Sequence, residues 1–315
     1  MATSSSIKKL RSEWRLYFFV LPAVVLIGTF CYFPAASAIY HSFFRWGGGD
    51  AKEFIGLANF RRAAGDIVFW ESFIVIAILV TSNVIKLIPS VFMAVLIHRL
   101  KSERWQYWYR VGVVLPMIVP GLVTLFIWKF FFDPGQGALN RFLDLTGLKA
   151  LLVSLDEFFH WGIFHAGLPI AWLGEPSLII PSLIIWGFPW IGSVGVLIYL
   201  AGLQSIGNEV YEAAELDGAT SWQTFRFMEL PLIMTQIRLS LVMLIISTLQ
   251  GYGLQFLLLG PEGGPGGRGM VPGLWMFNKA FFAGEFGYAC ALGIFLFLFI
   301  LALTFLNQRY VRVEK

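Results

Sequence analysis

The chain has 315 residues, of which 57% are hydrophobic and 13% are charged, with a formal net charge of +4. Soluble domains carry about 25% charged residues, so this chain cannot cover itself with polar groups and must use lipid as its solvent. The basic residues lie in short segments that flank apolar runs, which argues against a nucleic-acid partner. Cys31 and Cys290 lie inside apolar runs, so we expect small core residues rather than a disulfide framework.

Six apolar segments are each long enough to cross a bilayer, which takes about 20 residues in a helix. Backbone groups in hydrocarbon must be satisfied within the segment itself, so we expect helices. The predicted fold class is therefore all-α, a polytopic membrane protein with six transmembrane helices. The segments are roughly 16–40, 71–97, 111–132, 178–203, 235–260 and 286–308.

The first apolar segment has some features of a secretory signal peptide. Basic residues precede it, and Ala36-Ser37-Ala38 has the small-residue pattern of a cleavage site. Its apolar core, from Leu16 to Phe33, exceeds the roughly 7–15 residues of a signal-peptide core. We therefore expect an uncleaved membrane anchor.

The distribution of Lys and Arg predicts the orientation, because cytoplasmic loops carry an excess of positive charge. The side that holds the N-terminus carries more of these residues than the other side. We therefore expect both termini in the cytoplasm. The predicted organisation is a cytoplasmic segment 1–15, a membrane domain 16–308 and a cytoplasmic tail 309–315.

Polar side chains inside apolar segments are costly, so each is a candidate for function. Asn83 and Lys86 lie three residues apart and share one face of the second helix; Lys86 either faces water or makes a structural contact with a neighbouring helix. In the fifth segment, Gln250 and Tyr252 lie among glycines that permit local unwinding. Amides and an aromatic ring suit a sugar, and interhelical packing is the alternative. We expect Gln250, Tyr252 and Asn83 to contact a substrate.

No residue pattern indicates catalysis. His160 and His165 lie five residues apart without acidic residues at metal-ligand spacing. The glycine-rich stretch 260–269 lacks the Lys-Ser/Thr ending of a phosphate-binding loop. We predict no catalytic residues, no metal and no cofactor bound by this chain.

The polar segment 207–231 lies between two apolar segments on the predicted cytoplasmic side. We expect two short helices there, separated by a tight bend at Gly218, with Ser221 capping the second. Ala213 and Ala214 reduce the bulk of the first helix on one side. A compact helix of this kind can enter a groove on a second protein. The alternative interpretation is an ordinary cytosolic loop without a partner.

This segment resembles the EAA loop of binding-protein-dependent ABC importer permeases, with Met228 where the pattern usually has Ile. Further runs resemble the carbohydrate branch of that family, the maltose-permease-like inner-membrane subunits. One of them is Gly-Leu-Ala-Asn-Phe at 56–60, in which we expect Asn59 to cap a helix. The residues that match the EAA loop are Glu212, Ala213, Ala214, Gly218, Leu230 and Pro231.

The resemblance implies the type I ABC importer permease architecture in a bacterial inner membrane. It implies that the six matching residues couple this chain to an ATPase. The implied partners are a second homologous permease subunit, two cytosolic ATP-binding cassette subunits that bind ATP and Mg, and an extracellular or periplasmic solute-binding protein. The implied substrate is a sugar or oligosaccharide.

Two alternatives remain open. One is an ABC permease for another small solute, such as a glycerol phosphate or a polyamine. The other is an ion-coupled secondary transporter, a class that often has inverted repeats and intramembrane carboxylates. We find no such repeat, and the nearest carboxylate, Glu71, lies at the edge of a predicted helix.

The predicted orientation can be tested with a single cysteine at the C-terminus. In a variant with Cys31→Ala and Cys290→Ala, Lys315→Cys should react with a membrane-impermeant maleimide only in inverted vesicles, because we expect the tail in the cytoplasm. Labelling from the periplasmic side of intact cells would contradict an even number of spans.

Overall fold

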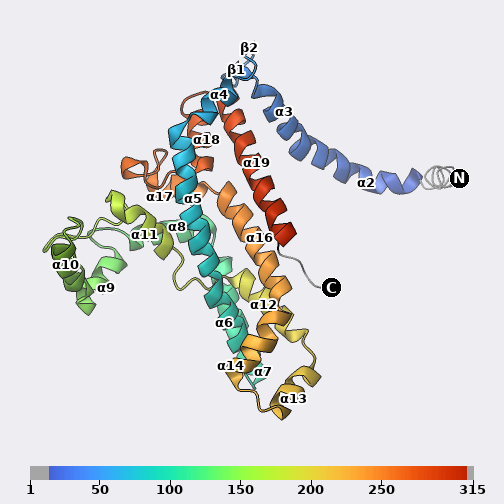
Figure 1. The fold of residues 1–315 in the computed structure, drawn as a ribbon, viewed down its shortest axis with the longest axis vertical. Helices are drawn as coiled ribbons and strands as arrows, with labels where there is room; N and C mark the ends of the chain where they lie inside the picture. The colour runs from blue at the N-terminus through green and yellow to red at the C-terminus, as the bar shows by residue number, and fades with distance from the viewer. Residues whose placement is uncertain (1–13, 311–315) are drawn as a thin grey trace. The chain divides into compact units, whose positions relative to one another are not determined.

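The structure is a computed structural model that describes residues 14–310. Helices form nearly all of its regular structure (Figure 1). Within the described residues, the only sheet is an antiparallel pair, β1 (Phe44–Trp46) and β2 (Lys52–Phe54). The predicted all-α class is confirmed.

Three helical segments of the described chain are long and apolar enough to cross a membrane. Two more candidates are bent pairs: Glu103–Ile118 with Gly121–Phe131, bent by 88°, and Ser221–Leu232 with Met234–Gln250, bent by 64°. By length and composition the described residues thus provide three spans, or up to five if each bent pair is one span. The three unbroken segments are Phe18–His41, Ile67–His98 and Phe286–Phe305.

The predicted fourth span, 178–203, is not one continuous helix. α11 (Ile179–Ile185) ends before an irregular stretch, and α12 (Ser193–Gln204) begins after it. Gly187 in this stretch has a φ of +78°, which glycine adopts without strain, and Pro189 has no N–H to donate to a helix. The prediction of an unbroken helix was wrong here, and the count of six spans stays a prediction.

The predicted fifth span also breaks where its glycines predicted local unwinding. α16 (Met234–Gln250) ends at an extended Gly251, and α17 (Gly253–Leu259) starts two residues later. The other helices are α2 (Trp14–Ile27), α3 (Phe33–His41), α4 (Ala58–Ala64), α5 (Ile67–Ile85), α6 (Leu87–His98), α7 (Glu103–Val114), α8 (Gly121–Phe131), α9 (Ala138–Thr146), α10 (Leu148–Phe159), α13 (Asn208–Leu216), α14 (Ser221–Thr224), α15 (Leu230–Leu232), α18 (Pro272–Phe281) and α19 (Phe286–Tyr310).

The packed residues fall into two units. The first consists of the described residues up to Asp66 together with Met276–Phe297. In it, Asn59 does not cap α4, because it lies inside the helix; its amide instead donates to the carbonyls of Ser42 and Phe44, each at 2.9 Å. This buried amide thus ties α4 to the loop that leads into β1.

A cluster of polar side chains connects two helices of the first unit. Arg62 makes two hydrogen bonds of 2.9 Å to the two carboxylate oxygens of Glu285, and its guanidinium lies 3.9 Å from the ring centre of Tyr288. The hydrogen bonds to Glu285 raise the pKa of Arg62 above its ordinary value, against the opposing effect of burial. The pair joins α4 to the start of α19.

The second unit consists of Ile67–Trp275 with the described residues from Leu298 onward. Its tightest helix pair is α6 against α12, where side chains recur at the spacing of one helix face. Lipid tails are as apolar as these side chains, so close packing rather than water exclusion must hold the pair together. The buried residues are Val91, Ala94 and Val95 on α6, and Val196, Tyr199, Leu200 and Leu203 on α12.

Candidate functional site

The segment 207–231 folds as the predicted pair of short helices, which we call the α13–α14 hairpin. Gly218 follows α13 with a φ of +70°, a conformation that glycine adopts at helix C-termini. The N–H of Ala219 donates to the carbonyl of Ala214 at 2.9 Å, which satisfies one of the last carbonyls of α13. The predicted bend at Gly218 is confirmed.

The cap of α14 is Thr220 rather than the predicted Ser221. The N–H of Gln223 donates to the Thr220 hydroxyl at 3.3 Å, and the Thr220 N–H donates back to the Gln223 side chain at 2.7 Å. This reciprocal pair needs Gln three residues after the cap, and Thr220 is the residue at that distance.

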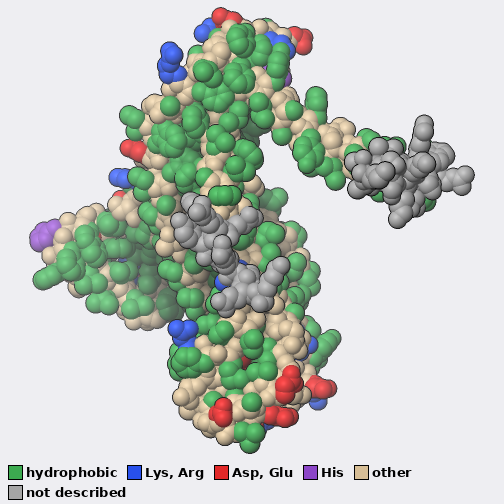
Figure 2. Space-filling view, turned by 45° about the vertical axis from the view of Figure 1, so that its right-hand side comes forward, with side chains coloured by type: hydrophobic (Ala, Val, Ile, Leu, Met, Phe, Trp, Pro, Cys, Tyr) green, Lys and Arg blue, Asp and Glu red, His purple; other side chains and the backbone are tan. Residues whose placement is uncertain are grey.

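The outer face of the hairpin combines carboxylates with large apolar side chains. Figure 2 shows Asp and Glu side chains gathered at the lower end of the view, where Figure 1 places α13. Ala214 is buried, whereas Ala213 and Glu212 are exposed, and Glu212 forms no ion pair within the described residues. The exposed apolar side chains are Leu216 at 89%, Trp222 at 61% and Phe227 at 72%.

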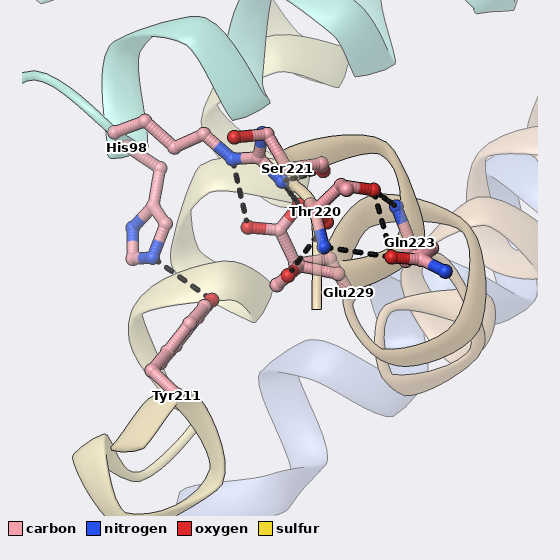
Figure 3. A network of polar contacts seen from close by, with 8 residues as sticks. His98, Tyr211, Thr220, Ser221, Gln223 and Glu229 are labelled. Atoms are coloured by element: carbon pink, nitrogen blue, oxygen red, sulfur yellow. Dashed lines mark hydrogen bonds and ion pairs between the residues drawn. The ribbon is translucent and has the colours of Figure 1, made fainter. Parts of the chain in front are cut away.

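A partly buried ion pair anchors the hairpin to the end of α6 (Figure 3). Nη2 and Nε of Arg99 donate to the two carboxylate oxygens of Glu229 at 2.6 and 3.2 Å. The Glu229 side chain is 1% exposed, and a buried carboxylate needs an ion-pair partner such as Arg99 to offset the cost of leaving water. Nη2 of Arg99 also donates to the carbonyl of Ser221 at 3.0 Å, which fixes the start of α14.

A second contact joins α6 to α13. The hydroxyl of Tyr211 lies 3.0 Å from Nε2 of His98. Burial raises the pKa of Tyr211 to about 12, and the nearby Glu229 acts in the same direction. The hydroxyl therefore keeps its proton and can donate it to a neutral imidazole. The end of α6 thus holds both helices of the hairpin.

Sequence reasoning missed Glu229 and the role of Arg99. The only local sign of a role for Glu229 is that it is a lone carboxylate between Met228 and the apolar start of the next segment. The remaining motif residues, Leu230 and Pro231, form α15, with Leu230 packed against the α6–α12 core and Pro231 exposed in the first turn.

The predicted substrate residues are only partly brought together. Asn83 and Tyr252 line one cavity of about 310 Å³, and the Asn83 amide donates to the Thr248 hydroxyl at 3.1 Å. Gln250 is exposed at the end of α16 and does not line this cavity, whereas the buried Gln255 does. Of Gln250 and Tyr252, which lie on either side of Gly251 at the end of α16, only Tyr252 therefore lines this cavity.

The described residues offer no ready metal site. No group of three or more His, Cys, Asp or Glu side chains among them lies close enough together to hold an ion. The α13–α14 hairpin and the cavity at Asn83 and Tyr252 offer hydrogen bonding, aromatic contacts and charge pairing.

The ion pair between Arg99 and Glu229 predicts that loss of either charge weakens the hairpin. Glu229→Gln keeps the shape of the side chain but leaves Arg99 without its counter-charge, and Arg99 is a third exposed. We expect a loss of about 1–3 kcal/mol in the local stability of the hairpin. The measurement is the rate of limited proteolysis within 207–231 in the purified protein, with the exposed Glu215→Gln as control. Equal cleavage of the two variants would contradict a stabilising role for the pair.

Known proteins resemble this chain over nearly its whole length. It is 29% identical over 307 residues to a probable ABC transporter permease of Pyrococcus horikoshii, covering 94% of this chain and 96% of that protein. It is 28% identical to the lactose transport system permease protein of Rhizobium radiobacter, covering 100% of both.

A solved structure has the same fold. One chain of a bacterial alginate ABC transporter, in complex with an alginate pentasaccharide-bound periplasmic protein, matches with a TM-score of 0.77 at 19% identity, covering 97% of this chain and 96% of that one. The predicted permease fold is thus confirmed. Residues 86–312, which include the ion pair and the hairpin, match the family described as "Binding-protein-dependent transport system inner membrane component". The chain belongs to this family of ABC transporter permeases.

Proposed function

We propose that this chain is the permease subunit of an ATP-driven importer for a sugar or oligosaccharide, and that the α13–α14 hairpin docks on a cytosolic ATPase subunit. The observation that carries the proposal is the hairpin itself. Its exposed face is acidic and apolar, and its inner side is anchored to α6 through Arg99 and Glu229. A hairpin that is anchored in this way can pass a movement of the ATPase on to α6, whereas a flexible loop cannot.

The sugar assignment rests on the relatives and on the cavity chemistry. The relative from Rhizobium radiobacter is named for lactose transport. In the second unit, one cavity is lined by Trp186 and Trp190 together with Asn83 and Thr248. Aromatic faces stack on the apolar faces of sugar rings, and amides and hydroxyls match their hydroxyl groups.

In the proposed mechanism, ATP acts only through the partner subunits. Two ATP-binding cassette subunits bind ATP and Mg, and one of them receives the α13–α14 hairpin in a groove. Glu212 makes a charge contact there, and the small Ala213 and Gly218 permit close approach. Closure of the ATPases then favours one orientation of the pore over the other, which needs only a difference in the stability of the two states.

The rest of the proposed assembly follows the same plan. A second, homologous permease subunit completes the pore, and a periplasmic or extracellular solute-binding protein delivers the substrate. The complex lies in the bacterial inner membrane with both termini of this chain in the cytoplasm. An ion-coupled transporter is disfavoured, because none of the residues that line the three cavities around Lys86 is acidic.

Docking predicts that Gly218 tolerates no large side chain. Gly218→Leu and the control Gly147→Leu both place leucine at a φ of 70–74° with open space around the new Cβ, so both carry similar strain. Only Gly218→Leu should abolish transport and stimulated ATPase activity in the assembled importer, while both variants reach the membrane in equal amounts. Equal transport by the two variants would refute docking through this bend. Glu212→Lys should in addition reduce copurification of the ATPase.

The cavity predicts which side chains bind substrate. Asn83→Ala should lower uptake about 5-fold or more, since a lost hydrogen bond at a desolvated site costs about 1–3 kcal/mol. Gln250→Ala should do the same if this amide contacts the sugar as the sequence predicts. Basal ATPase activity should persist in both variants. If Asn83→Ala lowers uptake and Gln250→Ala does not, the substrate site is limited to the residues around Asn83 and Tyr252.

A further inference from the structure

Lys86 places a positive charge within the second unit, between two helices that form one candidate membrane span. It lies at the junction of α5 and α6, and its ammonium donates to the carbonyls of Leu183 and Trp186 at 3.3 and 3.4 Å. Both carbonyls belong to the end of α11, where the helix break leaves them without helical partners. The two contacts use two of the three N–H groups of the ammonium and hold it in place.

Lys86 lines three cavities. The largest has a volume of about 620 Å³, and Lys86 also lines the neighbouring cavities of about 520 and 310 Å³. The ring centre of Trp190 lies 5.8 Å from Nζ of Lys86, and Trp186 lines two of the three cavities. A charged group and two indole rings thus border the same space.

Nothing in the surrounding segments neutralises this charge. No Asp or Glu occurs in the stretches 72–102, 176–208 or 230–261, which supply all the residues that line the largest cavity. Lys86 has no carboxylate partner within the described residues. Backbone carbonyls carry partial charges only, so they orient the ammonium without cancelling its charge. An unneutralised charge at membrane depth is costly and typical of a substrate or ion pathway.

We infer that the cavity at Lys86 binds an anionic sugar or polyol, whose carboxylate, sulfonate or phosphate pairs with the ammonium. The indole rings of Trp186 and Trp190 stack on the carbon skeleton, and Asn83 and Thr248 serve its hydroxyl groups. This inference rests on the proposed sugar function and narrows it. A polyamine is excluded from the same space by like-charge repulsion with Lys86.

The test uses four ligands that share one glucose skeleton: glucose, glucuronate, 6-deoxy-6-sulfoglucose and glucose 6-phosphate. Their affinities for the purified complete transporter are measured in detergent by saturation-transfer NMR, which needs no delivery by a binding protein. We expect at least one anion to bind 10-fold or more tightly than glucose. The anion that binds best identifies the acidic group.

Two variants assign the effect to the charge. Lys86→Gln keeps a donor for the carbonyls of α11 and removes the charge, so the advantage of the anion over glucose should fall to about 2-fold or less. Lys86→Arg keeps the charge and should retain most of the advantage. Size-exclusion chromatography checks that both variants assemble. If they do not, the comparison of anion with glucose in the wild-type transporter still tests the inference.

The outcomes separate this inference from the function on which it rests. If glucose binds as tightly as the anions, or if Lys86→Gln keeps the full anion advantage, the inference is wrong and the sugar function stands. If none of the four ligands binds and the transporter imports no sugar, both are wrong.

Discussion

A broken helix in a membrane leaves backbone groups that water cannot satisfy, and the centre of this protein is built around such a break. Between α11 and α12 the chain runs without helical hydrogen bonds. Side chains of the second predicted span supply the missing partners. Lys86 donates to two carbonyls at the end of α11, and the Ser90 hydroxyl accepts from the N–H of Gly192 at 2.9 Å. Non-helical backbone at this depth is tolerated where it lines a cavity, as it does here.

The need for hydrogen-bond partners inside the protein also explains why polar residues occur within apolar segments. The Ser193 hydroxyl donates to the carbonyl of Val113 at 2.6 Å, and Asn83 donates to Thr248. Each contact joins helices that lie far apart in the sequence. In lipid, where apolar side chains gain little from leaving the solvent, such hydrogen bonds and close packing determine which helices meet.

Helix α6 links the cavity to the hairpin. It has 12 residues and is therefore about 18 Å long. Lys86 and Ser90 lie at its first end, and His98 and Arg99 lie at its last. Because α6 is also packed along α12, a displacement of the hairpin would reach the cavity through a rigid element rather than through a flexible chain. The coupling proposed between the hairpin and the cavity would therefore have a physical route within one unit of this chain.

The sequence alone determined the features that depend on local patterns. Long apolar runs predict membrane helices wherever they occur, and Gly218 predicts a bend because only glycine adopts its φ without strain. The spacing of the EAA-like residues pointed to the family. The pairing of Arg99 with Glu229 was decided only by tertiary structure, because 130 residues separate them and nothing local requires it. The choice of Asn83 and Tyr252 over Gln250 as cavity residues also depends on where α16 breaks and what packs beside it. Local sequence reports propensity, whereas burial and charge compensation arise only when distant segments meet.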